Sequence, residues 1–192
     1  MIVLASASPR RAHILRQLGI EFRVVVSDAD ESLLPGEDGA QAAERLARVK
    51  AETVARSESL PVLGADTIVL CDGHILGKPA SPEEARAMLG RLAGRTHQVV
   101  TGLCLVAGGL VRSGRDATEV RLAALSAAEI DWYVSTGEPL DKAGAYHIDG
   151  RGGLFIETVA GSPSNVAGLP VRTLLRLARE AGLDLGPGAG LV

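Results

Sequence analysis

The stretch Leu4-Ala5-Ser6-Ala7-Ser8-Pro9-Arg10-Arg11 predicts a strand that runs through a short turn into a helix. The apolar residues that end at Leu4 are typical of a buried strand. Ser8 and Pro9 then stand at the preferred N-cap and first positions of a helix. Two arginines follow in the first turn, where the positive end of the helix dipole normally favours acidic residues. The stretch therefore indicates a phosphate site, and the alternative is a pair of solvated arginines on a surface helix.

The composition predicts a folded chain that forms one domain, or one domain with two lobes. The chain has 192 residues, of which 46% are apolar and 22% are charged. We expect a single domain over residues 1–185, followed by a loose Gly/Pro-rich tail over 186–192.

The same numbers disfavour several classes of partner. A net charge of −3 and an aromatic content of 3% argue against a nucleic-acid partner. The sequence has no signal-peptide pattern and no apolar run near the ~20 residues of a membrane span, so no membrane partner is expected. Cys71 and Cys104 stand alone, without CxxC spacing, which is typical of a reduced interior. We therefore expect a cytoplasmic protein.

The order of apolar patterns and turn signals predicts a mixed α/β fold. Helices are expected over residues 9–18, 39–57, 81–94 and 126–135, and from Pro170 to Gly182. Strands are expected over residues 2–4, 22–26, 61–71, 97–106, 117–122, 146–148 and 154–158. Hairpin signals lie among the alternating strands and helices, so a mixed sheet is expected.

Asp66 interrupts a strand that is otherwise apolar over residues 62–70. A carboxylate in a buried strand is costly unless it is paired, protonated or bound to a metal. Asp66 is therefore the strongest candidate for a catalytic or metal-binding residue. The alternative is a carboxylate at a strand end that caps a neighbouring loop.

Two lysines are weaker candidates. Lys50 lies four residues after Leu46 on the helix over 39–57, so it flanks the buried stripe. Lys78 lies in the rigid turn Gly77-Lys78-Pro79, where a lysine is ordinarily solvated.

Two polar loops could also carry chemistry. Asp28, Asp30 and Glu31 are typical of a polar turn, but they also offer the oxygen ligands that Mg²⁺ or Mn²⁺ prefers. The loop over 141–146 combines opposite charges, a flexible glycine and a tyrosine, a density that is more typical of a binding site than of a plain connection. The histidines lack zinc-site spacing, and the sequence contains no GxSxG elbow, Walker loop or Rossmann fingerprint.

Five motifs, taken in order, resemble those of the Maf family of nucleoside triphosphate pyrophosphatases. They are Leu4-Ala5-Ser6-x-Ser8-Pro9-Arg10-Arg11, Gly64-Ala65-Asp66-Thr67, Gly77-Lys78-Pro79, Asp141-Lys142-Ala143-Gly144-x-Tyr146-x-Ile148-x-Gly150 and Ser164-Asn165-Val166-x-Gly168-Leu169-Pro170. The resemblance runs from Ile2 to the final helix. It implies an elongated mixed sheet flanked by helices, with two lobes around a cleft, similar to the inosine triphosphate pyrophosphatases. It also implies hydrolysis of a nucleoside triphosphate to its monophosphate and pyrophosphate with a divalent metal, Mg²⁺ or Mn²⁺.

The resemblance also implies roles for individual residues. Asp66 matches the catalytic aspartate, which either takes a proton from water or holds the metal. Glu31 matches an acidic position near the metal, and Ser8 matches the serine of the phosphate-binding turn. The cations that match triphosphate ligands are Arg10, Arg11, Lys50 and Lys78.

Substrate choice in this family follows three positions. Arg10 and Thr67 resemble the branch that acts on dTTP and UTP, so dTTP, UTP or modified nucleotides are the expected substrates. The third position carries Asp149 where that branch usually has glutamine. An ionised aspartate accepts hydrogen bonds but donates none, so it can pair with the N–H of uracil or thymine and repels the carbonyls.

Two other classes of function remain open from the sequence. One is a nucleotide-binding regulator of cell division and septum formation without significant turnover. The other is an RNA- or tRNA-binding module, which the net charge of −3 disfavours. A homodimer is compatible with the sequence.

Overall fold

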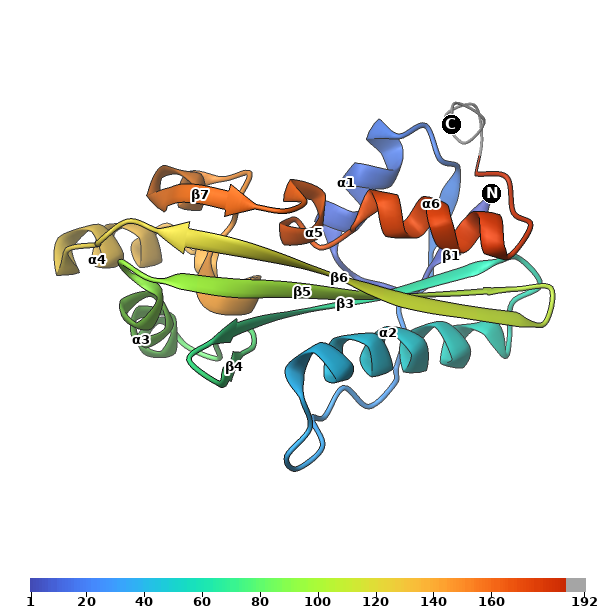
Figure 1. Cartoon of the computed structure of the whole chain (residues 1–192), viewed down its shortest axis with the longest axis horizontal. Helices are drawn as coiled ribbons and strands as arrows, with labels where there is room; N and C mark the ends of the chain where they lie inside the picture. The colour runs from blue at the N-terminus through green and yellow to red at the C-terminus, as the bar shows by residue number, and fades with distance from the viewer. Residues whose placement is uncertain (186–192) are drawn as a thin grey trace. The chain divides into compact units, whose positions relative to one another are not determined.

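The computed structural model describes residues 1–185 and has the predicted mixed α/β architecture (Figure 1). Its strands are β1 (Ile2–Leu4), β2 (Phe22–Val24), β3 (Val62–Cys71), β4 (His74–Leu76), β5 (Thr96–Ala107), β6 (Leu110–Leu122) and β7 (Ile156–Ala160). Its α-helices are α1 (Pro9–Gln17), α2 (Gly39–Ala55), α3 (Pro82–Leu92), α4 (Ala127–Ser135), α5 (Pro163–Val166) and α6 (Val171–Glu180). Its 3₁₀ helices are η1 (Glu138–Asp141), η2 (Ala143–Ala145) and η3 (Arg151–Phe155).

The strands within residues 1–185 form a seven-stranded mixed sheet. Its order is β2-β1-β3-β5-β6-β7, and β4 pairs with β3. Strand β1 is parallel to both β2 and β3, whereas β4 is antiparallel to β3 and β7 is antiparallel to β6. The β3–β4 turn carries Asp72 and Gly73 with positive φ of 49° and 75°, as expected for a tight hairpin. The predicted mixed sheet is confirmed.

The described residues divide into two compact units. Unit 1 contains Met1–Asp66, Thr101–Asp116 and the segment that begins at Gly168, and unit 2 contains Thr67–Val100 and Ala117–Ala167. Helices α1, α2 and α6 therefore belong to unit 1, and α3, α4 and α5 to unit 2.

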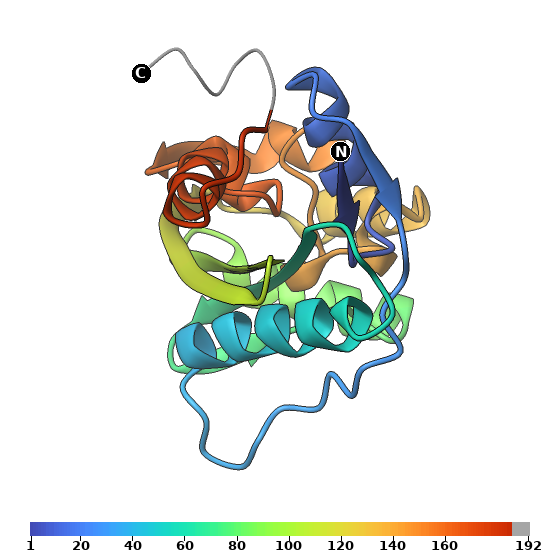
Figure 2. The same cartoon turned by 90° about the vertical axis from the view of Figure 1, so that its right-hand side faces the viewer.

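In unit 1, helices cover both faces of the sheet, with α2 on one face and α6 on the other (Figures 1 and 2). Successive side chains of a strand point to opposite faces. Leu63 and Ala65 of β3 accordingly pack in a core with α1 and α6, whereas Val62 packs in a core with Ala47 and Ala51 of α2. Asp66 follows Val62 and Gly64 in the same alternation, so its side chain belongs to the α2 face.

Two glycines allow α2 to lie directly on this face. A Cβ at Gly64 would stand 2.2 Å from the carbonyl oxygen of Ala47, and one at Gly102 would stand 2.2 Å from that of Ala43. Such distances are far below van der Waals contact, so any side chain at either position would push the helix away. Gly64 thereby sets the distance between α2 and β3, the strand that carries Asp66, and Gly102 sets the distance between α2 and β5.

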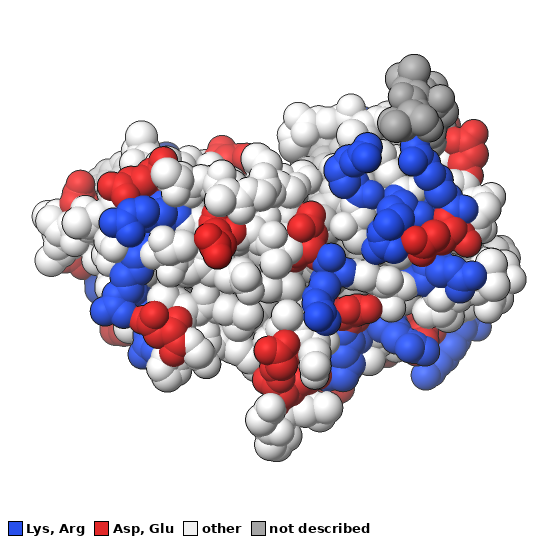
Figure 3. Space-filling view, in the orientation of Figure 1, with Lys and Arg blue, Asp and Glu red and all other residues white. Residues whose placement is uncertain are grey.

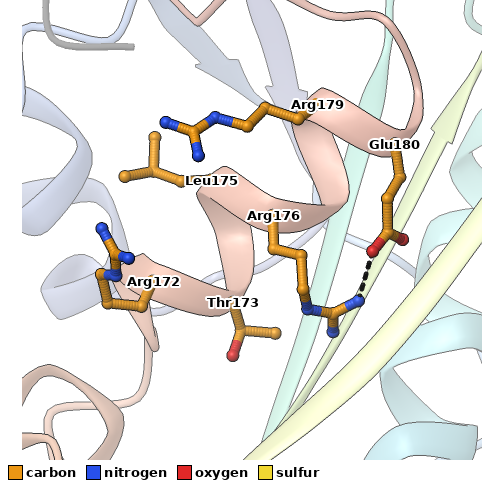
Figure 4. Close-up of a pocket in the computed structure, with 6 residues that line it drawn as sticks. All are labelled: Arg172, Thr173, Leu175, Arg176, Arg179 and Glu180. Atoms are coloured by element: carbon orange, nitrogen blue, oxygen red, sulfur yellow. Dashed lines mark hydrogen bonds and ion pairs between the residues drawn. The ribbon is translucent and has the colours of Figure 1, made fainter. Parts of the chain in front are cut away.

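The outer face of α6 is basic. Arg172, Arg176 and Arg179 line a shallow pocket on this helix, with an ion pair of 2.7 Å between Arg176 and Glu180 (Figure 4). Figure 3 shows Lys and Arg side chains gathered over α6, with acidic side chains among them. This pocket contains none of the residues that the sequence predicts for the site.

The core of unit 2 holds most of the aromatic side chains of the chain. Tyr133 of α4 packs edge-on against Phe155, with ring centroids 5.3 Å apart, and Trp132 also meets Phe155 edge-on. His97 and Tyr146 form a second pair in which the histidine Nε2 lies 2.8 Å from the tyrosine hydroxyl. His97 is 3% exposed, and burial lowers its pKa to about 4.

The low pKa of His97 predicts a loss of stability in weak acid. The folded protein keeps His97 neutral down to about pH 4, whereas the unfolded chain protonates it below about pH 6.5. We expect His97 to contribute ~2 kcal/mol to the fall in unfolding free energy between pH 7 and pH 5. Urea unfolding at both pH values should show a fall that is smaller by this amount in His97→Gln, which cannot titrate. An equal fall in both proteins would contradict the prediction.

Several predicted elements are wrong or incomplete. Residues 146–148 form no strand, because 146 and 147 are irregular and a turn begins at 148. Residues 151–155 form η3, so the predicted strand over 154–158 begins at Ile156. The predicted strand over 117–122 begins seven residues earlier, at Leu110, because the polar residues 112–116 pair in the sheet while staying partly exposed. Helix α5 was not predicted. The expected tail over 186–192 lies outside the described residues.

Among residues 1–185, none of the helices combines the length and apolar character that a membrane crossing requires.

Candidate active site

Lys50 links Asp66 and Glu31, the two carboxylates that the family resemblance places at or near the metal. Its Nζ lies 2.6 Å from Oδ1 of Asp66 and 2.7 Å from Oε2 of Glu31. The Lys50 side chain is 8% exposed and that of Asp66 is 14% exposed, whereas Glu31 is largely open to solvent. An ammonium this buried requires its carboxylate partners. The prediction that Lys50 only flanks the buried stripe is therefore too weak, because the side chain is itself buried.

The fold brings this pair together through α2 and β3. Asp66 faces α2 from the interior of β3, and the contact of the helix with Gly64 brings the Lys50 turn against the strand. The alternative in which Asp66 ends a strand and caps a loop is wrong, because β3 continues to Cys71.

The turn between β1 and α1 is stabilised by hydrogen bonds from the buried side chain of Arg11 and to the side chain of Ser6. Ser8 holds the N-cap position of α1 as predicted, but its side chain makes no capping hydrogen bond in the described structure. Its N–H donates instead to Oγ of Ser6 at 3.2 Å. Arg11 donates from Nη1 to the same Oγ and from Nε to the carbonyl of Gly168, each at 2.8 Å. Arg11 therefore fixes the shape of the turn, and the alternative of a solvated arginine is wrong for this residue.

Opposite charges meet around Arg11. Burial is the largest influence on its guanidinium and lowers its pKa, the carboxylates of Asp66 and Glu31 act to raise it, and the charge of Arg10 lowers it further. These influences place Arg10, Arg11, Glu31 and Asp66 in one electrostatic neighbourhood of unit 1. The first turn of α1 contains no acidic residue, so its positive end stays available to an anion.

The acidic side chains fit a metal that arrives with a phosphate. Within the part of the chain that the structure describes, no three His, Cys, Asp or Glu side chains gather as a metal cage. Glu31 and Asp66 nevertheless converge on one point, the Lys50 ammonium. Mg²⁺ is often held by one or two carboxylates together with substrate phosphates and water. Asp30 stabilises its own turn, because its Oδ1 accepts the N–H of Ser32 at 2.9 Å. The polar-turn interpretation is therefore confirmed for this residue.

The remaining predicted site residues belong to unit 2. Thr67 is half-buried in β3, and Lys78 and Asp149 are exposed in loops. The Lys78 loop is anchored where the carbonyl of Gly77 accepts the N–H of Gly144 at 3.0 Å. The predicted binding loop over 141–146 thus contacts the Lys78 turn through its backbone.

The motif from Ser164 to Pro170 has a structural use that the sequence did not reveal. Asn165 is fully buried, and its Nδ2 donates to the carbonyl of Val99 and to Oγ1 of Thr118, both at 2.9 Å. The amide therefore ties α5 to β5 and β6. Gly168, with a φ of +97°, supplies the carbonyl that holds Arg11.

Sequence reasoning also missed Ser6, which receives both Arg11 and the Ser8 N–H. A serine in a small-residue turn carries no pattern that distinguishes it from its neighbours. Its role became visible only through the hydrogen bonds that converge on its oxygen.

Known proteins resemble this chain over nearly its full length. The family described as Maf-like protein matches residues 1–181. The chain is similar to the dTTP/UTP pyrophosphatase of Symbiobacterium thermophilum, with 48% identity over 188 residues that cover 97% of each chain. It is 50% identical to the dTTP/UTP pyrophosphatase of Thermococcus onnurineus, over 96% of this chain and 100% of that protein. The Ham1 protein of Staphylococcus aureus, a solved structure, aligns over 64% of this chain and 71% of its own, with 17% identity and a TM-score of 0.46.

Proposed function

This chain belongs to the Maf family, and from that membership we propose that it is a nucleoside triphosphate pyrophosphatase. Water attacks the α phosphorus, the bond to the bridging oxygen breaks, and the products are a nucleoside monophosphate and pyrophosphate. Relatives that are 44–50% identical over nearly the whole chain and are named dTTP/UTP pyrophosphatase support this activity.

The observation that carries the proposal is the Lys50 ammonium, 2.6 Å from Asp66 and 2.7 Å from Glu31. A largely enclosed strand carboxylate that is paired in this way is preorganised, because its orientation is set before any substrate binds. Arg10 and Arg11 lie in the same electrostatic neighbourhood, beside the open positive end of α1. Preorganised charge next to an anion site is what phosphate transfer requires, since most of its catalysis is positioning and charge neutralisation.

Each of these residues has a task in the proposed reaction. Asp66 orients the attacking water and accepts its proton, or holds the metal beside it. Lys50 keeps the Asp66 and Glu31 carboxylates from repelling each other and holds both in place. The first turn of α1, braced by Arg11, receives phosphate oxygens. A divalent ion such as Mg²⁺ or Mn²⁺, which Glu31 and Asp66 would hold, supplies charge neutralisation at the phosphates.

A substrate screen tests the proposal directly. Canonical and modified nucleoside triphosphates are incubated with the purified protein and Mg²⁺ or Mn²⁺, and release of pyrophosphate is measured. We expect turnover with dTTP, UTP or their modified forms. Nucleotide binding without release of pyrophosphate would overturn the proposal and favour a regulatory role in cell division. Location in the cytoplasm stays a prediction.

Lys78 is expected to recognise the phosphates beyond the α position. It is exposed in a loop, so its removal should leave the fold intact. We expect Lys78→Ala to weaken inhibition or binding by nucleoside triphosphates roughly 10-fold, as the loss of a charge-assisted phosphate contact requires. Affinity for the monophosphate should change by less than about 3-fold. Inhibition constants for both ligands test this, with Arg86→Ala as a control that removes an exposed cation paired with Asp131.

If Lys78→Ala weakens the triphosphate and the monophosphate equally, Lys78 lies near the base or the sugar instead. Arg11→Ala is a poorer test, because Arg11 also braces the turn through Ser6 and Gly168.

Asp149 is expected to govern which base is accepted. A glutamine amide can donate to one pyrimidine carbonyl and accept from N3–H, whereas an ionised aspartate can only accept. We expect Asp149→Gln to raise the ratio of kcat/KM for dTTP or UTP to that for other nucleotides by roughly 10-fold or more. Steady-state kinetics on matched nucleotides measure this ratio. An unchanged ratio would show that Asp149 does not face the base.

A further inference from the structure

Asp149 occupies the corner of a tight turn. The N–H of Gly150 donates to the carbonyl of His147 at 3.2 Å, which leaves Ile148 and Asp149 as the two central residues of a β-turn. Asp149 is exposed, whereas the residues before the turn are buried. The direction of its carboxylate is therefore determined by whatever holds the two ends of the turn.

Both ends are held by one hydrogen-bonded group, which we call the Glu138 clasp and which consists of Glu138 and Tyr133. At the entry to the turn, the N–H of His147 donates to the hydroxyl of Tyr133 at 3.0 Å. That hydroxyl donates in turn to Oε1 of Glu138 at 2.8 Å. At the exit, the backbone N–H groups of Arg151 and Gly152 donate to the two oxygens of the same carboxylate, each at 3.1 Å.

The end of α4 places both members of the clasp. Tyr133 lies in the last turns of α4 with its ring fully buried, and Glu138 follows the helix end. Gly137 takes the left-handed conformation, with φ of +74°, and its N–H closes the helix onto the carbonyl of Val134. The end of α4 therefore places a carboxylate and a hydroxyl against the backbone of the turn and of the first residues of η3.

Gly150 at the end of the turn and Gly152 in η3 leave room for the clasp. A Cβ at Gly150 would stand 2.7 Å from Oε1 of Glu138, and one at Gly152 would stand 2.6 Å from the Tyr133 hydroxyl. Both positions must lack a side chain so that the carboxylate and the hydroxyl can approach the backbone. Partial burial is the largest single influence on the pKa of Glu138 and acts to raise it, but hydrogen bonds from Tyr133, Gly152 and Arg151 together lower it, so the clasp stays charged.

We propose that Glu138, with Tyr133, is a positioning residue for base selection, because it holds both ends of the turn that carries Asp149. This inference rests on the proposed function, in which Asp149 faces the base. Glu138 itself touches no reacting atom. It acts by restricting the positions that the Asp149 carboxylate can take. A base that does not fit is then repelled by a charge in a fixed position, because the carboxylate cannot move aside.

The test measures nucleotide specificity in single variants of the clasp and again in a variant that lacks the Asp149 carboxylate. Glu138→Gln keeps the shape but presents an amide N–H₂ to at least one backbone N–H, and Tyr133→Phe removes only the hydroxyl. We expect each variant to lower the ratio of kcat/KM for the best nucleotide to that for the poorest by about 5-fold or more. In an Asp149→Ala background, Glu138→Gln should leave this ratio unchanged, since there is no carboxylate left to position.

Hydrogen exchange provides a second measurement that needs no activity. Amides of residues 147–153 should exchange at least 10-fold faster in Glu138→Gln, while those of β3 stay protected. Glu157→Gln is the matched control, because Glu157 is an exposed carboxylate of unit 2 that pairs with Arg121 at 2.8 Å. It should change neither the ratio nor the exchange of the turn.

Failure of this inference is distinct from failure of the proposed function. If the wild-type protein releases no pyrophosphate from any nucleotide, the proposed function fails. If the wild type is active and Glu138→Gln lowers kcat/KM by one factor for every nucleotide, the clasp is only structural and the inference is overturned. A changed ratio that persists in the Asp149→Ala background overturns it as well.

Discussion

Asp66→Asn is expected to lower kcat by at least ~10²-fold with every nucleotide that the wild type hydrolyses. Asparagine preserves the size of the side chain and can still accept a hydrogen bond from Lys50, but it can neither take a proton from water nor neutralise a cation. The loss should appear in kcat more than in KM, because the triphosphate cations are unchanged. Pyrophosphate release under saturating nucleotide measures it.

The fold should survive this substitution. Glu31 remains 2.7 Å from the Lys50 ammonium, so the buried cation keeps one charged partner. We expect the unfolding free energy to fall by less than about 2 kcal/mol, measured by urea denaturation. Asp131→Asn is the matched control, since it neutralises an exposed aspartate that pairs with Arg86 at 2.6 Å. Activity above a tenth of wild type in Asp66→Asn would remove Asp66 from the catalytic role.

Lys50→Met is expected to have a comparable effect, with a loss of at least ~10²-fold in kcat/KM. Methionine fills a similar volume, so the packing of α2 against β3 should persist. Without the ammonium, the carboxylates of Glu31 and Asp66 lose their shared partner and repel each other, and the site also loses positive charge for the phosphates. Steady-state kinetics measure the loss, and circular dichroism at the assay temperature checks the fold.

The double variant separates this explanation from a general loss of positive charge. If Lys50 acts by holding Asp66, then Lys50→Met combined with Asp66→Asn should lose little more activity than Asp66→Asn alone. Losses that multiply would indicate that the two residues act independently. Arg48→Met is the control, because Arg48 lies on the exposed side of α2, where it pairs with Glu52 at 2.7 Å.

Elements with a local cause were predictable from the sequence. Ser126 and Glu129 form the predicted capping box at the start of α4, with both reciprocal hydrogen bonds present. Asp72 and Gly73 form the predicted hairpin turn. Ser8 and Pro9 mark the start of α1. In each case the partners lie within a few residues of one another, so short-range backbone chemistry decides the structure.

Elements that depend on distant partners were not predictable in this way. Residues 146–148 and 154–158 were predicted as strands, but the N–H of His147 donates to Tyr133 instead of to a neighbouring strand. Further along the chain, the N–H groups of Arg151 and Gly152 donate to Glu138. Strand β6 begins at Leu110 although residues 112–116 are polar, because pairing with neighbouring strands outweighs their weak strand pattern.

The candidate site shows the same division. Asp66 could be singled out from the residues around it, since a carboxylate within an apolar strand is costly wherever that strand packs. Its partners depend on long-range packing, because Lys50 is sixteen residues away and reaches Asp66 only when α2 packs on Gly64. Long-range packing likewise decides that Arg11 braces the turn through Gly168, a contact between residues 157 positions apart. Composition and spacing determine which groups must be paired, and packing of the folded chain decides which group pairs with which.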